Sequence, residues 1–370
     1  MRRLTAWLTL LLLLCGSAAA EEAARQALRD ADMRGIVEFA AEYGAEVDPS
    51  LVAEAALRGD MPDMRELFGM VKARITAPVL DALRMGEALL APVLLLGLIR
   101  CALPDASGGS GGVRFLLRLT LLIGFSEAAM GALSASADCI RAAKSLSGAA
   151  APALTALLAA MGMAGTSALV SPAAALIGDA AEGLFLNWGM PLCRFALCTA
   201  IAGSLSSAVD LSGMAKLLRK SANWGAGLAT TLFTAMLALQ GSVAGAVDGV
   251  AVRTAKFAVD SAAPVIGSGV SDAWDSYVSG ILIAKNAVGL SGIAALLGAA
   301  LKPLLACAAS MLTLNLISAL LSALGEKDTA RAAEQVSGIC QMALSLATGA
   351  VAIATVLLGA AMAAGGSLAG

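Results

Sequence analysis

The sequence predicts an all-α, polytopic membrane protein of about seven or eight transmembrane or re-entrant helices, preceded by a signal peptide and a small helical extracytoplasmic region. Composition is the first reason: 59% of the 370 residues are hydrophobic and 14% are charged, unlike the balance of a soluble globular protein. The second reason is pattern. Apolar runs of about 20 residues, the length that crosses the hydrocarbon core of a bilayer, alternate with short polar connections.

Residues 1–20 have the organisation of a signal peptide. Arg2 and Arg3 precede an apolar run, and Ala18-Ala19-Ala20 supplies the small residues of a cleavage site. We therefore expect the mature chain to begin at Glu21. An uncleaved anchor and a lipoprotein signal ending at Cys15 are the alternatives.

Residues 21–79 are polar, with charges of both signs. Apolar side chains recur at three- and four-residue spacing, which predicts two or three short amphipathic helices. Breaks are expected at Pro49 and Pro62, with Ser50 as the N-cap of the following helix. This region is either a solvated spacer on the membrane surface or a docking module, and its composition does not distinguish the two.

Residues 80–370 form the predicted membrane domain. Its candidate spans are Arg84–Leu103, Val113–Ala135, Ala150–Gly178, Leu184–Ala208, Asn223–Val247, Ile281–Leu301, Pro303–Leu324 and Val336–Ala364. Two of them meet at Lys302-Pro303, which predicts a tight antiparallel pair. The run that contains Gly162, Gly165 and Ser171-Pro172 is typical of a broken or re-entrant helix.

The orientation follows from the basic loop that holds Lys216, Arg219 and Lys220. A cleaved signal and a full set of crossings would place this loop outside, against the positive-inside rule. If one of the first four runs does not cross, the loop becomes cytoplasmic. We favour this arrangement of seven spans, which places residues 248–277 on the outer face.

The segment 241–289 is longer and more polar than a simple connection between membrane helices needs to be. Gly241, Gly245 and Gly249 fall every fourth residue, so on a helix they form a smooth stripe where another helix can pack closely. Pro264 and the glycines at 267–269 are expected to end that helix. The polar residues of the segment are Asp248, Arg253, Lys256, Asp260, Asp272, Asp275, Lys285 and Asn286.

Four motifs in this segment carry a resemblance: VDGVAVRTAKF at 247–257, PVIG at 264–267, SDAWD at 271–275 and LIAKNAVG at 282–289. Together they closely resemble the stage III sporulation protein AE family of endospore-forming bacteria. The resemblance implies a subunit of a multi-protein complex in the mother-cell membrane around the forespore, needed for late forespore development. It implies as partners the other subunits of the sporulation stage III complex and, indirectly, proteins of the forespore membrane.

The residues themselves argue against catalysis. The chain has no histidine, which removes Ser-His-Asp and Cys-His activation and the commonest metal ligand. The GxSG run therefore predicts helix packing at Gly289 and Gly292 rather than a protease site. Asp272 and Asp275 lack the GxGD motif of an intramembrane aspartyl protease and are expected in a solvated, loop-like stretch. We expect no enzymatic activity.

We also expect no cofactor, no metal and no disulfide, because the cysteines lie in apolar runs without CxxC spacing. The glycine-rich run at 107–112 lacks the ending that binds phosphates, so any ATP used by the assembly is hydrolysed by another subunit. A net charge of −2 without basic and aromatic clusters argues against nucleic acid. The lipid bilayer is the expected surrounding.

Ionisable residues inside the apolar runs need partners, because a charge in hydrocarbon is costly. Glu87 and Lys285 lie near predicted span ends, where either snorkelling or a misplaced span boundary is expected. Arg118 and Glu127 are expected to form an intramembrane pair, and Arg194 lies well inside its run. A polar seam of this kind suits either a conducting path or a subunit interface.

Two function classes follow. The first is a non-enzymatic subunit of the sporulation transenvelope complex, either scaffold or channel component. The second is a self-contained secondary transporter for a small solute, with its site at the break near residues 162–172 and the charges at 248–285. The resemblance favours the first, and the lack of an internal repeat disfavours the second.

Overall fold

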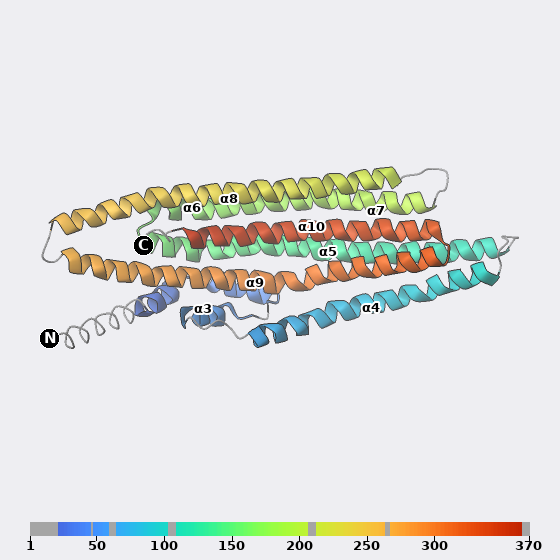
Figure 1. Cartoon of the computed structure of the whole chain (residues 1–370), viewed down its shortest axis with the longest axis horizontal. Helices are drawn as coiled ribbons and strands as arrows, with labels where there is room; N and C mark the ends of the chain where they lie inside the picture. The colour runs from blue at the N-terminus through green and yellow to red at the C-terminus, as the bar shows by residue number, and fades with distance from the viewer. Residues whose placement is uncertain are drawn as a thin grey trace, which may run out of the picture.

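The computed structural model describes residues 21–45, 47–58, 64–102, 109–205, 212–262 and 267–364. Within these residues the chain is helical apart from short connections, and it contains no strand, so the predicted all-α class is confirmed. Figure 1 shows the long helices lying side by side along one axis, with short N-terminal helices, among them α2 and α3, against one flank.

The elements follow one another with few interruptions. They are α2 (Arg34–Glu42), α3 (Pro49–Arg58), α4 (Met64–Ala102), α5 (Gly109–Ala160), α6 (Ala164–Glu182), the π-helix η1 (Gly183–Gly189), α7 (Met190–Leu205), α8 (Ser212–Ala262), α9 (Gly267–Ala323) and α10 (Lys327–Ala363). Because α6, η1 and α7 are contiguous, they form one rod.

Within the described part of the chain, five helical stretches are long and apolar enough to cross a membrane. They are Thr76–Arg100, Gly111–Ala160, Ala164–Leu205, Trp274–Ala323 and Lys327–Ala363. Membrane-spanning character is thus supported, whereas the number of crossings and the signal peptide stay predictions. The signal peptide, residues 1–20, lies outside the described residues.

The helices are far longer than the predicted spans. α5, α8 and α9 contain 52, 51 and 57 residues, which at 1.5 Å per residue corresponds to roughly 75–85 Å, more than twice the hydrocarbon thickness. The predicted antiparallel pair at Lys302-Pro303 is wrong, because both residues lie inside the continuous helix α9. A proline removes one helical hydrogen bond, whereas ending the helix there would leave several backbone groups unpaired.

Two reversals of the chain within the described residues occur at glycines with positive φ. Gly162 (φ 80°) separates α5 from α6, and Gly325 (φ 82°) separates α9 from α10. At each one the next amide donates to the carbonyl five residues back, Met163 to Leu158 in the first case, which is a Schellman ending. The predicted break at Gly162 is confirmed, but it is a hairpin between two long helices, and Ser171-Pro172 continues inside α6.

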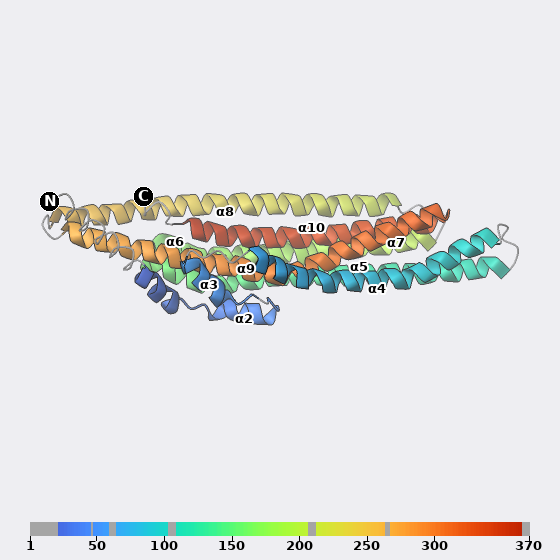
Figure 2. The ribbon, with the colours of Figure 1, turned by 60° about the horizontal axis from the view of Figure 1, so that its bottom comes forward.

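The centre of the bundle is α10. More than half of its 37 residues are buried, and it lies among α5, α7, α8 and α9 (Figures 1 and 2). Close approach depends on small residues: a Cβ on Gly189 of η1 would lie 2.9 Å from the Leu346 side chain of α10. Small-residue packing of this kind replaces bulky interdigitation between membrane helices.

The N-terminal helices pack on the flank formed by α5 and α9 (Figure 2). The N-cap of α3 is Asp48 rather than the predicted Ser50: its carboxylate accepts hydrogen bonds from the Ser50 hydroxyl (2.6 Å) and amide (2.9 Å). These two bonds hold the pKa of Asp48 below its ordinary value, and the bond from the Ser50 hydroxyl has the larger effect. Pro49 then takes the first helical position, where its missing N–H costs nothing.

Candidate functional site

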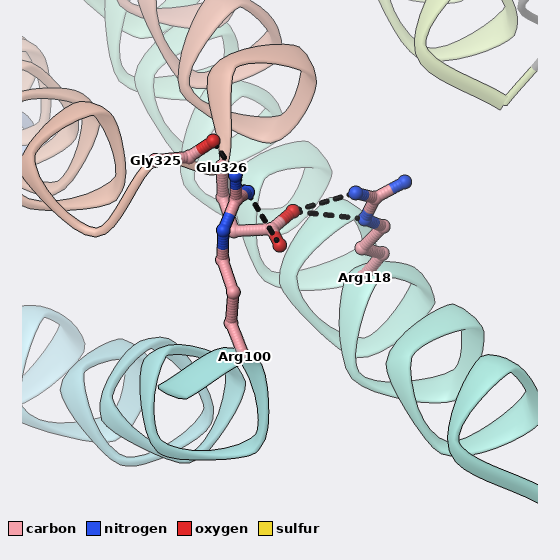
Figure 3. A network of polar contacts seen from close by, with 4 residues as sticks. All are labelled: Arg100, Arg118, Gly325 and Glu326. Atoms are coloured by element: carbon pink, nitrogen blue, oxygen red, sulfur yellow. Dashed lines mark hydrogen bonds and ion pairs between the residues drawn. The ribbon is translucent and has the colours of Figure 1, made fainter. Parts of the chain in front are cut away.

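At one end of the bundle, a buried carboxylate in the α9–α10 turn forms ion pairs with α4 and α5. Glu326 follows Gly325 in the α9–α10 turn, and its side chain is only 2% exposed. Arg118 of α5 donates to one carboxylate oxygen through Nη2 (2.6 Å) and Nε (3.2 Å). Arg100 of α4 donates to the other oxygen (3.3 Å) and to the Gly325 carbonyl (2.6 Å). Figure 3 shows both arginines converging on Glu326.

We name Arg100, Arg118, Gly325 and Glu326 the end clamp. Both carboxylate oxygens are satisfied by charged donors, which is the condition under which a buried ion is tolerated. Since its members come from α4, α5 and the α9–α10 turn, the clamp holds four long helices at one level.

The predicted pairing of Arg118 with Glu127 is wrong. The two residues lie nine positions apart on α5, which at about 100° per residue places them on opposite faces of one helix. Arg118 pairs with Glu326 instead, and Glu127 lines a cavity between α4, α5 and α9.

A second charged cluster lies at mid-length. Lys144 of α5 forms ion pairs with Asp179 (2.9 Å) and Glu182 of α6. The π-helix η1 begins directly after Glu182, and its Trp188 ring packs over Gly225 of α8, where a Cβ would lie 2.4 Å from the ring. Single-turn π-helices inside longer helices are frequent at functional sites, so this level of the bundle combines charge with irregular backbone.

The expectation that Lys285 snorkels is wrong. Its side chain is fully buried, and its ammonium group donates to the carbonyl of Ala364 at the end of α10. A cation at a helix C-terminus satisfies an unpaired carbonyl and complements the helix dipole. The neighbouring Asn286 is exposed, as is Arg194 on α7, so these predicted residues do not converge on one site.

The predicted signature segment is helical on both sides of residues 263–266. α8 ends at Ala262, before Pro264, whereas Gly267, Ser268 and Gly269 belong to the first turn of α9, so they do not end a helix. The loop-like setting predicted for Asp272 and Asp275 is wrong, because both lie in α9. Pro264 lies outside the described residues, as do the side chains of Asp248, Arg253, Lys256, Asp260 and Asp272 and the close surroundings of Gly241, Gly245 and Gly249.

Gly289 and Gly292 face α10 with different clearances. A Cβ on Gly289 would lie 2.3 Å from Met362 Cγ and 2.4 Å from its sulfur, whereas one on Gly292 would lie 3.4 Å from the nearest atom, on Leu358. The first distance is a clash and the second is an ordinary contact. Gly289 is therefore the closer approach of the two.

We expect Gly289→Ala to destabilise the purified chain by about 1–3 kcal/mol, the cost of overpacking. Gly292→Ala serves as the matched control and is expected to be neutral or to stabilise by up to about 1 kcal/mol, because alanine is the better helix former. Thermal unfolding in detergent measures both. Equal melting temperatures for the two variants would contradict the assignment of the closer packing to Gly289.

Among the described residues, no three His, Cys, Asp or Glu side chains gather in a way that could hold a metal ion. Five cysteines are free thiols: Cys139, Cys193, Cys198, Cys307 and Cys340. The absence of a cofactor and of enzymatic activity stays a prediction from sequence.

Sequence reasoning missed Glu326, Arg100 and the partners of Lys144. The run Gly325 to Asp328 has the composition of a polar connection, and Arg100 lies 226 positions before Glu326. The one available signal in the sequence was the pair Gly325-Glu326, a glycine followed by a carboxylate between two apolar runs.

Comparison with known proteins identifies similar chains. The family described as Stage III sporulation protein AE matches residues 110–365, from the start of α5 to the end of α10. The protein named Stage III sporulation protein AE from Bacillus subtilis (strain 168) is 32% identical over 174 residues, which is 47% of this chain and 44% of that relative. The match therefore spans less than half of the relative's length. No solved structure matches the chain.

Proposed function

The chain belongs to the stage III sporulation protein AE family, and on that premise we propose that it is a non-enzymatic integral membrane subunit of the sporulation transenvelope complex. Its place is the mother-cell membrane around the forespore, where it supports late forespore development. Its partners are the other subunits of the stage III complex and, through them, proteins of the forespore membrane.

The observation that carries this proposal is the extent of the family match, which covers the helices from α5 to α10. A scaffold or channel component needs rigid elements that cross one membrane and reach a partner beyond it. Helices of roughly 75–85 Å meet this need, because one bilayer accounts for about 30 Å of their length.

The filled axis of the bundle supports a scaffold, or a channel formed between subunits, over a self-contained transporter. α10 occupies the centre, and its neighbours approach it closely at Gly189 and Gly289. The transporter alternative also loses the re-entrant site predicted near Gly162, since that glycine joins two long helices. A path through the complex would then lie between this subunit and its partners.

Deletion of the gene in the source bacterium tests the proposal. We expect normal vegetative growth and completed engulfment, followed by loss of late forespore gene expression, with a plasmid copy restoring it. Tagged full-length chain is expected to recover other stage III subunits from membranes of sporulating cells. Normal spores combined with a nutrient or ion phenotype would contradict the proposal and favour the transporter.

A further inference from the structure

A cavity of about 480 Å³ lies between α4, α5 and α9. Its walls follow helical spacing: α9 contributes Lys302, Ala306 and Ser310 at every fourth residue, and α5 contributes Thr120 and Glu127, which lie seven residues apart on one face. α4 forms the outer wall at the edge of the bundle (Figures 1 and 2). The cavity therefore lies on the flank of the bundle, within helices that are apolar enough to cross a membrane.

Small residues create the room. At one level Leu89 of α4 packs onto Gly124 of α5, where a Cβ would lie 2.4 Å from Leu89 Cδ2. Seven residues along the same face, a Cβ on Gly131 would meet nothing within 4 Å. α4 and α5 thus touch at Gly124 but not at Gly131. A larger side chain at position 131 can therefore fill the cavity without a clash.

The cavity carries an unmatched charge of each sign. Asp81 forms an ion pair with Arg84 of its own helix (3.7 Å). Glu127 on the α5 wall and Lys302 on the α9 wall, by contrast, form no hydrogen bond or ion pair with any part of the chain that the structure describes. Charged groups at membrane depth need counter-charges. One free carboxylate and one free ammonium group call for a ligand that carries both signs.

The rest of the lining selects the kind of ligand. Thr120 and Ser310 add hydroxyl oxygens to the lining. Each hydroxyl donates to a carbonyl of its own helix, of Leu116 and Ala306, and keeps lone pairs that can accept from an ammonium group. Met85, Leu89 and Ile123 make the remaining wall apolar. A polar headgroup attached to an apolar body fits such a mixture, and an opening on the flank gives access from the bilayer.

We propose that this cavity binds a zwitterionic headgroup in which a primary ammonium group is joined by a short link to a phosphate. The ammonium group binds Glu127, and the phosphate binds Lys302. A phosphatidylethanolamine-type lipid or a free solute of the same chemistry can present this group. The proposal goes beyond the role in sporulation and stands or falls independently, because binding is measured on the purified chain.

The test uses full-length chain in nanodiscs of equimolar phosphatidylethanolamine, phosphatidylcholine and phosphatidylglycerol, with retained lipid identified by native mass spectrometry after transfer to detergent. Phosphatidylcholine has the same phosphate but a methylated nitrogen without N–H donors, and phosphatidylglycerol lacks the cation. We expect phosphatidylethanolamine to be retained about fivefold or more above either one. Gly131→Met, which fills the cavity, is expected to abolish this preference.

Gly148→Met is the matched control, because Gly148 lies on the same helix, also meets nothing within 4 Å, and does not line the cavity. Lys302→Gln provides a second test that does not depend on filling the cavity. Lys302 is exposed, and its replacement removes the proposed phosphate contact, so this variant is also expected to lose the retained phosphatidylethanolamine. A separate arm titrates lipid-free chain in detergent with glycerophosphoethanolamine. Binding there, lost in Gly131→Met, together with no lipid preference would assign the site to a soluble zwitterion. Equal retention of all three lipids and no binding of the soluble headgroup would overturn the proposal.

Discussion

Replacing Arg118 with methionine is expected to destabilise the chain by about 2–3 kcal/mol, because the variant leaves the buried Glu326 carboxylate with one cationic partner. Breaking a fully buried ion pair costs about 3–5 kcal/mol. The lower figure applies here because Arg118 is 40% exposed and Arg100 remains in place. Thermal or denaturant unfolding of the purified protein measures the change.

A double-mutant cycle separates the ion pair from packing effects. Glu326→Gln removes the buried charge, so Arg118→Met in that background is expected to cost much less than it does alone. Arg141→Met is the matched control on the same helix: its pair with Asp138, at 2.8 Å, is nearly as short as the 2.6 Å pair of Arg118, but both side chains are more than half exposed. Such surface pairs contribute about 0–1 kcal/mol. Equal losses for Arg118→Met and Arg141→Met would show that the end clamp does not stabilise the bundle.

The helical class could be predicted from the sequence, whereas the helix lengths could not. A run of about 20 apolar residues predicts a span, but nothing local distinguishes a glycine or proline that ends a helix from one that the helix tolerates. Gly162 and Pro303 illustrate the difference. Gly162 has positive φ and ends α5 within the run where a break was predicted, whereas Pro303 lies inside α9, which packs against α4, α5 and α10.

The polar contacts were less predictable than the helices, because their partners lie far apart in the chain. Lys144 and Glu182 are 38 positions apart, and Arg118 and Glu326 are 208 apart. Spacing along one helix predicts only neighbours at three or four positions. Gly289 could be singled out from a motif, but its close approach to α10 depends on Met362, a partner that only the fold supplies.

The contact between α2 and α5 is another close approach that depends on a partner far away in the chain, and it can be tested. Gly35, in the first turn of α2, lies against the α5 backbone: a Cβ there would be 2.8 Å from the Ala149 carbonyl oxygen and 3.3 Å from its Cα. Backbone atoms cannot rotate away as a side chain can. The apolar face next to this contact, Ile36 and Phe39, is buried.

Gly35→Leu is therefore expected to lift α2 from α5 and to expose Ile36 and Phe39, whose burial is worth about 1.5–3 kcal/mol each. Hydrogen exchange measures the effect: protection of residues 34–42 is expected to fall by about tenfold or more, while α10 keeps its protection, because the change is local. Gly148→Leu provides the control, since Gly148 is next to Ala149 yet faces open space. If both variants keep the protection of the unmodified chain, α2 does not depend on this backbone contact. If only Gly35→Leu loses it, the packing of α2 on α5 depends on the close approach of the two backbones at Gly35.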